Sequence, residues 1–128
     1  MDKQPECPFC NRAPESLLIE TEQVFALRDG YPVSAGHTLV GPRQHVRTLF
    51  ELPRHDQLAV WDLVERVRAK IVEEYSPDGF NIGLNDGLAA GQTVPHVHIH
   101  VIPRYDGDVP DPRGGIRWVI PDKARYWE

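Results

Sequence analysis

Residues 96–103, His-Val-His-Ile-His-Val-Ile-Pro, decide the fold of this chain and the chemistry that it can carry. Histidine and apolar residues alternate over the first six positions, and side chains two apart on a β-strand share a face. We therefore predict a strand with three histidines on one face, neighbouring imidazoles lying about 6–7 Å apart. The other face is predicted to enter the core. The histidines are His96, His98 and His100, and the core side chains are Val97, Ile99 and Val101.

The chain before this strand predicts one long helix and several short strands. Residues 53–74 carry apolar side chains at steps of three and four, the period of an amphipathic helix, and the proline at its start suits a first helical turn. The predicted apolar stripe consists of Leu58, Trp61, Val64, Val67, Ile71 and Val72. Short strands are predicted at residues 17–20, 24–27, 38–40 and 80–84. A few antiparallel strands, one long helix and a short C-terminal piece make an α+β domain.

Length and composition limit the class of protein. With 128 residues, 41% of them apolar, the chain suits one domain, predicted to span residues 1–128. The chain contains no stretch of about twenty apolar residues, so we expect no membrane span. The first residues carry no apolar run, so we expect no signal peptide and a cytoplasmic location. A net charge of −5 argues against non-specific binding to nucleic acid, because such binding neutralises many phosphates. A small anionic ligand in a local pocket stays open.

Three alternating histidines admit three interpretations. They could form a polar strand face without chemistry, although imidazole has no special preference for strands. Two of them could ligate one metal ion. A neutral imidazole is also a nucleophile toward phosphorus, if an acceptor holds its other nitrogen and a neighbour protonates the leaving oxygen. The loop 87–93 favours this third interpretation, because its glycines can bring backbone N–H groups to an anion and Gln92 and Thr93 add side-chain donors.

Residues 96–102 match the pattern His-φ-His-φ-His-φ-φ, where φ is apolar, and here the chain resembles the histidine-triad (HIT) family of nucleotide hydrolases and transferases. The resemblance extends over residues 7–105 and leaves 106–128 as a variable loop and tail. Its upstream segments are a phosphate loop at 85–93, a strand at 36–40 that carries His37, and a ribose-facing segment at 25–29. It implies an antiparallel sheet of about five strands, one long helix and a short helical segment, paired as a homodimer.

The resemblance also implies a role for each residue of the site. His98 is the expected nucleophile, His100 contacts the phosphate and the leaving oxygen, and His37 supports them. The expected nucleotide-binding residues are Asp29 on the ribose, Asn85, Gly91, Gln92 and Thr93 on the phosphates, and His98 and His100. The uridylyltransferase branch has glutamine where this chain has His100, so the resemblance does not favour that branch.

The expected function is hydrolysis at the α-phosphate of a dinucleoside polyphosphate or a nucleoside phosphoramidate, with a purine base by resemblance. A phosphorylase or nucleotidyl transferase, in which phosphate or another nucleotide replaces water, is one alternative. A sensor that binds a nucleotide without turnover is another. The triad chemistry itself needs no metal, and Mg²⁺ is left open as a companion of a polyphosphate substrate.

Cys7 and Cys10 form a C-x-x-C pair, and the chain lacks the thioredoxin-like βαβ pattern that would favour redox chemistry. Zinc needs four ligands, so two more must come from elsewhere. Bacterial-type members of the resembled family carry such a pair, and the resemblance implies His45 and His96 as partners in a closed, structural zinc site. Two unremarkable thiols are the alternative. If zinc binds, His96 is a ligand and neither an acid nor a base.

Overall fold

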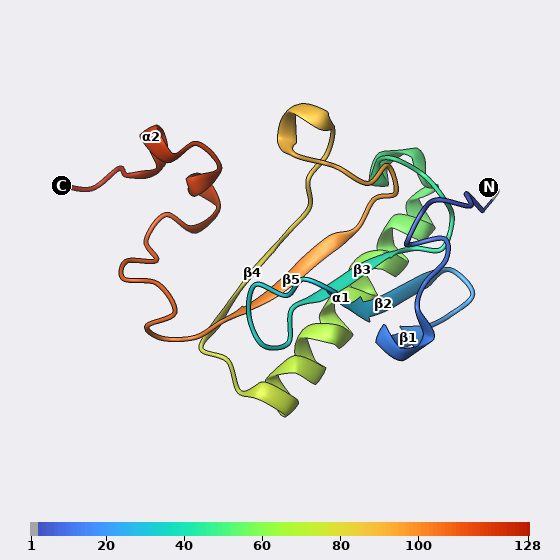
Figure 1. Ribbon diagram of the computed structural model, residues 1–128, viewed down its shortest axis with the longest axis horizontal. Coiled ribbons are helices and arrows are strands. Elements are labelled where there is room, and N and C mark those ends of the chain that lie inside the picture. Colours follow the sequence, from blue (N-terminus) through green and yellow to red (C-terminus); the bar gives the residue numbers. More distant parts are fainter. Residues whose placement is uncertain (1–2) are drawn as a thin grey trace.

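The computed structural model describes residues 3–128 and has the predicted α+β architecture (Figure 1). The strands are β1 (Leu17–Glu20), β2 (Val24–Arg28), β3 (Thr38–Pro42), β4 (Gly79–Gly83) and β5 (Ile99–Arg104). The helices are α1 (Arg54–Tyr75) and α2 (Pro121–Ala124). Short 3₁₀ turns lie at Pro14–Ser16, Leu49–Glu51, Leu88–Ala90 and Gly115–Val119. The fold class is therefore confirmed, with one antiparallel sheet, one long helix and a short one.

The strands form a five-stranded sheet in the order β1-β2-β3-β5-β4, so the histidine strand β5 is flanked on both sides. α1 packs across one face of the sheet, over β2, β3 and β5. The N-terminal segment covers the other face, because successive strand residues point to opposite sides: Ala26 belongs to the cluster under α1, whereas Phe25 and Leu27 pack with Cys7 and Phe9. Two thin apolar layers thus sandwich the sheet.

The alternation in the histidine stretch has the predicted consequence for the core. Val97, Ile99 and Val101 are buried, with exposed fractions of 1%, 0% and 0%. They belong to the cluster that packs beneath α1. The intervening histidines consequently lie toward the opposite face of the sheet, away from the helix.

The regular part of the histidine strand is shorter than predicted. β5 begins at Ile99, and the backbone N–H of Val97 donates to the carbonyl of Val46, in the loop after β3, at 2.8 Å. The segment carrying His96 and His98 therefore runs beside β3 without joining its ladder. This close approach needs Gly41, because a Cβ there would lie 2.8 Å from the Val97 carbonyl oxygen.

The predicted apolar stripe of α1 is wrong in three positions. Val64, Val67 and Ile71 are buried as expected, together with Val60 and Leu63. Leu58, Trp61 and Val72 are instead 53%, 43% and 43% exposed. At 3.6 residues per turn, they lie on a flank rotated by about 120° from the buried face, so α1 carries two apolar surfaces of which the sheet covers one.

The chain beyond β5 forms a separate C-terminal lobe, which Figure 1 shows displaced from the sheet. Hydrogen bonds within the lobe stabilise it: Arg117 Nε donates to the Ala124 carbonyl at 2.9 Å, and Trp118 Nε1 donates to the Arg113 carbonyl at 2.8 Å. Within residues 3–128, no helix has both the length and the apolar character that crossing a membrane requires.

Candidate active site and metal centre

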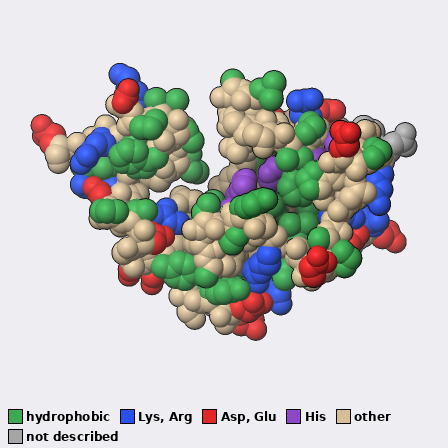
Figure 2. Space-filling view, in the orientation of Figure 1, with side chains coloured by type: hydrophobic (Ala, Val, Ile, Leu, Met, Phe, Trp, Pro, Cys, Tyr) green, Lys and Arg blue, Asp and Glu red, His purple; other side chains and the backbone are tan. Residues whose placement is uncertain are grey.

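A cavity of about 640 Å³ lies on the sheet face opposite α1. Figure 2 shows histidine side chains at the bottom of a hollow in the surface. All of the predicted catalytic and nucleotide-binding residues line this one cavity: Asp29, His37, Asn85, Gly91, Gln92, Thr93, His98 and His100. Pro8 and Phe9 of the N-terminal segment complete its wall. Residues that are as much as 92 positions apart in the sequence, Pro8 and His100, thus meet at one site.

The tautomer of His98 follows from its single hydrogen bond. Its Nδ1 lies 2.9 Å from the backbone carbonyl oxygen of His96, and a carbonyl can only accept, so Nδ1 carries the proton. In the neutral ring, Nε2 then carries the lone pair. Burial lowers the pKa of His98, which favours this neutral form, although Asp29 and the carbonyl act in the opposite direction. His98 therefore offers an uncharged, unshared nitrogen in the cavity.

The tautomers of His37 and His100 follow in the same way. The backbone N–H of Val33 donates to Nδ1 of His37 at 3.1 Å, so neutral His37 carries its proton on Nε2. That Nε2 lies 2.9 Å from Nδ1 of His100, to which it can donate. His100 then accepts at Nδ1 and carries its own proton on Nε2. Burial, followed by the nearby His98 and His37, lowers the pKa of His100 to about 4, so the ring is neutral near pH 7. The chain Val33–His37–His100 thus presents a hydrogen-bond donor beside His98.

Asp29 lies at the rim of this histidine chain. One carboxylate oxygen accepts the backbone N–H of Tyr31 at 2.8 Å, and the other lies 3.4 Å from Nε2 of His37. The ligand atoms of Asp29, His37 and His100 lie close enough to one another to hold a metal ion. A metal needs a lone pair on each ligand atom, and Nε2 of His37 has none while its Nδ1 accepts from Val33. The arrangement suits a hydrogen-bond chain better than metal binding.

The loop before β5 is braced from inside by Gln92. This side chain is 4% exposed: Oε1 accepts the N–H of Gly87 at 2.9 Å, and Nε2 donates to the carbonyls of Arg47 and Val94 at 2.9 and 3.1 Å. Its side-chain donors, expected to hold phosphate, are therefore engaged with the protein. Thr93 and Asn85 are exposed at the cavity, and Gly91 has the left-handed φ of +93° that turns the loop. Gln92 thus shapes the loop that presents the other donors.

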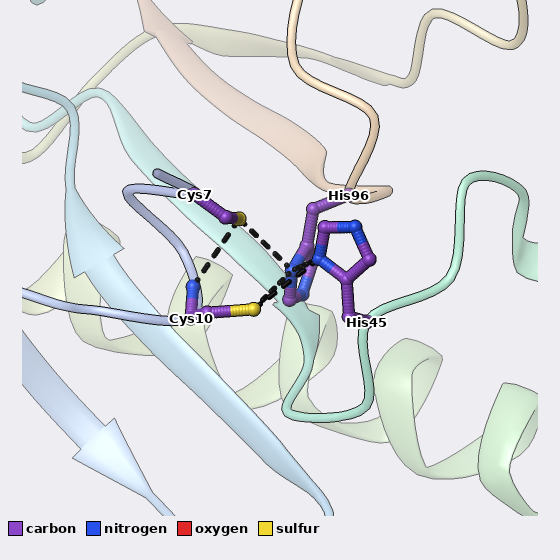
Figure 3. Close-up of side chains that lie close together, drawn as sticks. All are labelled: Cys7, Cys10, His45 and His96. Carbon is purple, nitrogen blue, oxygen red and sulfur yellow. Dashed lines mark hydrogen bonds between the residues drawn. The ribbon is translucent and has the colours of Figure 1, made fainter. Parts of the chain in front are cut away.

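The second cluster is the cysteine and histidine group at the end of the sheet (Figure 3). Its four ligand atoms lie within 4.8 Å of one another. Nδ1 of His96 lies 3.4 Å from Cys7 Sγ, 3.6 Å from Cys10 Sγ and 3.2 Å from Nδ1 of His45, and the Cys10–His45 distance is 3.2 Å. A zinc tetrahedron has edges of about 3.3 Å between nitrogens and about 3.6 Å between nitrogen and sulfur. These four of the six edges therefore fit zinc within a few tenths of an ångström, and the other two lie within 4.8 Å.

The hydrogen bonding of His96 also fits a metal ligand. Its Nε2 lies 2.7 Å from the Pro42 carbonyl oxygen and must donate to it, which leaves the lone pair on Nδ1. That lone pair faces the sulfurs of Cys7 and Cys10. A backbone carbonyl that fixes the tautomer of a ligating histidine is a common feature of metal sites. The four predicted residues can therefore hold zinc in a closed site.

A family model described as the HIT domain matches residues 11–107. The chain belongs to the HIT family. Among its HIT relatives, an uncharacterized HIT-like protein of Methanocaldococcus jannaschii is 39% identical over 106 residues, covering 80% of this chain and 81% of the relative.

Two further HIT relatives are named for their activities. An adenylylsulfatase of Arabidopsis thaliana is 37% identical over 109 residues, covering 82% of this chain and 55% of the relative. A bis(5'-adenosyl)-triphosphatase of Dictyostelium discoideum is 39% identical over 92 residues, covering 72% of this chain and 62% of the relative. The chain thus spans less than two thirds of either protein. At the level of the family, these names support a nucleotide hydrolase.

Solved HIT structures share the fold. A HIT family protein from Bacillus anthracis superposes with a TM-score of 0.75 and 37% identity, covering 81% of this chain and 77% of that one. A zinc-bound histidine-triad protein from Mycobacterium smegmatis gives 0.72 and 36%, covering 83% and 84%. A metal is thus present in a HIT protein of the same fold.

Sequence reasoning missed two groups at this HIT site. Phe9 lies between the cysteines and packs on the ring of His98, with 4.5 Å between ring centroids. Its position inside the C-x-x-C pair was the available signal. The backbone N–H of Val33, which fixes His37, left no signal, because any residue other than proline supplies one.

Proposed function

We propose that the protein hydrolyses a nucleotide at its α-phosphate through a nucleotidyl intermediate on Nε2 of His98. The observation that carries the proposal is the Nδ1–H bond from His98 to the His96 carbonyl, which leaves the Nε2 lone pair free in the cavity. A bare imidazole nitrogen is an effective nucleophile when the second nitrogen is held as a donor.

In the first step, Nε2 of His98 attacks the α-phosphorus and the bond from phosphorus to the leaving oxygen or nitrogen breaks. The Nε2–H of His100, whose own Nδ1 is held by His37, donates a hydrogen bond to the leaving atom. A leaving phosphate departs as an anion, and a leaving amine takes its proton from water. Thr93, Asn85 and backbone N–H groups of the loop stabilise the charge on the phosphate oxygens, as preorganised donors do. The enzyme now carries a nucleotidyl group on Nε2 of His98, whose Nδ1 keeps its proton, so this ring is a cation while His100 stays neutral.

In the second step, water attacks the same phosphorus and the phosphorus–nitrogen bond breaks. The water gives up one proton to the solvent, and the nucleoside monophosphate leaves. The lone pair returns to Nε2 of His98, and His100 keeps its tautomer throughout both steps. Each histidine thus serves the two steps in one position without rotating.

The proposed substrates are dinucleoside polyphosphates, with nucleoside phosphoramidates next, and a purine base. The names of two relatives, an adenosyl triphosphatase and an adenylylsulfatase, support an adenine nucleotide and water as the acceptor. Transfer to phosphate or to a second nucleotide would use the same intermediate. Product analysis with added phosphate distinguishes such transfer from hydrolysis. Mg²⁺ as a companion of a polyphosphate substrate stays a prediction. Among the described residues that line the cavity, Asp29 supplies the only carboxylate that could ligate it.

The test is to trap the intermediate. Protein mixed with a dinucleoside triphosphate labelled at the α-phosphate is denatured within milliseconds. Label should stay on wild type and be absent from His98→Ala. His55→Ala is the matched control, since the His55 side chain is 76% exposed and lies outside the cavity. A His98→Ala protein with normal turnover would refute the mechanism, and wild type that binds without turnover would identify a sensor.

We also propose that zinc occupies the group of Cys7, Cys10, His45 and His96. Four protein ligands leave no open position, so the ion would tie the N-terminal segment to the sheet and would not touch substrate. The match of the ligand spacings to a tetrahedron and the zinc-bound neighbour support this proposal.

We propose a homodimer formed through β4 and the exposed flank of α1. β4 is an edge strand of the sheet, and Leu58, Trp61 and Val72 leave an apolar patch on α1. A second copy could pair its own edge strand and cover the patch. Light scattering should give twice the 14.6 kDa chain mass, and Trp61→Glu should halve it. Phe50→Glu, at a position 71% exposed outside the patch, should not change the mass; a monomeric wild type would refute this proposal.

A further inference from the structure

The turn between the two cysteines presents one aromatic side chain to the histidine triad. Phe9 is 7% exposed, and its ring centroid lies 4.5 Å from that of His98, with the ring planes tilted by 42°. Cys7 and Cys10 on either side of it both belong to the metal group. The position of Phe9 therefore depends on the same side chains that would hold the ion.

The metal group reaches His98 by a second route. Nδ1 of His96 faces the cysteine sulfurs, while the backbone carbonyl of His96 accepts the Nδ1–H of His98. Residues of the metal group thus hold the ring of His98 at its Nδ1 edge, and Phe9 packs against the same ring in a tilted arrangement. On another side, the ring of His100 lies at 5.1 Å.

These contacts have different effects on the ring. One hydrogen bond fixes Nδ1 but still allows the imidazole to swing about that point. A bulky side chain packed against the ring, with 4.5 Å between centroids, restricts this freedom, since swinging would push the two rings together. Attack on phosphorus requires the reacting atoms to be aligned at about 3–3.5 Å. The Phe9 contact therefore matters for the direction of Nε2 rather than for its basicity.

We propose that Phe9 is a positioning residue that, carried by the metal-binding turn, holds the His98 ring in its attacking orientation. This inference rests on the proposed nucleophilic role of His98. It makes the metal group more than a clamp on the N-terminal segment: the ion would fix both the turn that carries Phe9 and the imidazole of His96 whose backbone holds Nδ1 of His98.

Two simpler roles for Phe9 have to be separated from this one. Phe9 packs against Phe25, with 6.0 Å between centroids and planes 21° apart, so it also fills the apolar layer. It lines the cavity as well, so it could contact a bound base. The first role predicts that loss of either phenylalanine has the same effect, and the second predicts a loss of affinity rather than of rate.

The experiment compares Phe9→Leu and Phe9→Met with Phe25→Leu, a matched control that loosens the same layer, since Phe25 is fully buried beside Phe9. Zinc content and unfolding temperature are measured first, and each variant should retain about one ion per chain. The rate of nucleotidyl transfer to His98 at saturating substrate should fall about 10- to 100-fold in both Phe9 variants and less than about threefold in Phe25→Leu. Affinity for a nucleoside monophosphate should change less than about threefold throughout.

A readout without substrate keeps this test independent of the proposed function. In imidazole NMR spectra, the Nδ1–H proton of His98 should give a sharp, slowly exchanging signal in wild type and in Phe25→Leu. The signal should broaden in the Phe9 variants. Equal rate losses in all three variants, an affinity loss that accounts for the rate, or an unchanged Nδ1–H signal in Phe9→Leu would overturn the positioning role. If wild type forms no nucleotidyl intermediate but the signal behaves as stated, the proposed function fails and the positioning stands.

Discussion

Replacing His37 by leucine tests whether the hydrogen bond from His100 to the leaving atom depends on the chain from Val33 to His100. Leucine keeps an apolar side chain of similar size at a position that is 3% exposed, but it accepts no bond from Val33 and donates none to His100. Nδ1 of His100 is then unheld, and the tautomer with its proton on Nδ1 becomes accessible. In that tautomer, Nε2 has no proton for the leaving atom.

The magnitude follows from the bond that is lost. A neutral hydrogen bond contributes about 0.5–1.5 kcal/mol, so the Nε2–H tautomer of His100 should lose up to about tenfold in population. Loss of the donor altogether would cost about 10²–10³-fold. Since His100 itself stays in place, we expect nucleotidyl transfer in His37→Leu to slow by up to about tenfold.

The assay compares two leaving groups in single-turnover experiments on wild type and His37→Leu. A nucleoside phosphoramidate releases an amine, a poor leaving group that gains most from a hydrogen bond at the leaving atom, whereas a nucleoside p-nitrophenyl phosphate releases a stable anion that gains least. The variant should be slow with the first and close to wild type with the second. An equal loss with both substrates would mean that His37 merely maintains the fold, and no loss with either would refute the proposed hydrogen-bond chain.

Three further outcomes can be measured on the same protein. Cys7→Ser should lower the metal content from about one ion per chain toward zero and lower the unfolding temperature, because a structural ion stabilises only the folded state; full metal retention would contradict the ligand set. The pKa of His100 is about 4 in the fold but near 6.5 in the unfolded chain, so the unfolded chain binds more protons as pH falls from 6.5 to 4. The free energy of unfolding should fall across that window, by about 1–2 kcal/mol after allowing for water at the ring, and less in His100→Gln; denaturant titrations at pH 7 and 5 measure it. Gln92→Leu unpairs the N–H of Gly87 and should weaken binding of a nucleoside monophosphate about tenfold by calorimetry, with the His98 Nδ1–H signal unchanged; unchanged affinity would mean that the loop holds without its brace.

Local patterns were enough to predict most of the fold. α1 was expected at residues 53–74 and spans Arg54–Tyr75, because apolar period and a starting proline are properties of the segment itself. The division of its apolar side chains could not be predicted in the same way. Periodicity shows that Trp61 and Val64 lie toward one side of a helix, but which of them meets the sheet depends on how the helix is rotated against β2, β3 and β5.

The site shows a similar division. The histidine motif indicated His98 and His100, and the other predicted catalytic and nucleotide-binding residues line the same cavity. What the motif could not indicate is which atoms are already engaged. Gln92 has the side-chain amide of a phosphate donor, yet that amide is hydrogen-bonded within the protein. One of its partners is the carbonyl of Arg47, which lies far away in the sequence.

The shortened strand bears directly on the chemistry of the nucleophile. In a regular ladder, strand carbonyls accept from the neighbouring strand. The segment with His96 and His98 lies outside β5, and there the His96 carbonyl accepts the Nδ1–H of His98 instead. Had the ladder continued to residue 96, as the alternation predicted, backbone N–H groups would compete for that carbonyl. His98 could then take the opposite tautomer, with its proton on Nε2 and its lone pair on Nδ1. The departure from regular pairing is possible because Gly41 lets the Val97 carbonyl approach where a Cβ would stand 2.8 Å away. An alanine at position 41 should therefore shift this segment and slow His98, even though the residue touches neither the cavity nor the metal group.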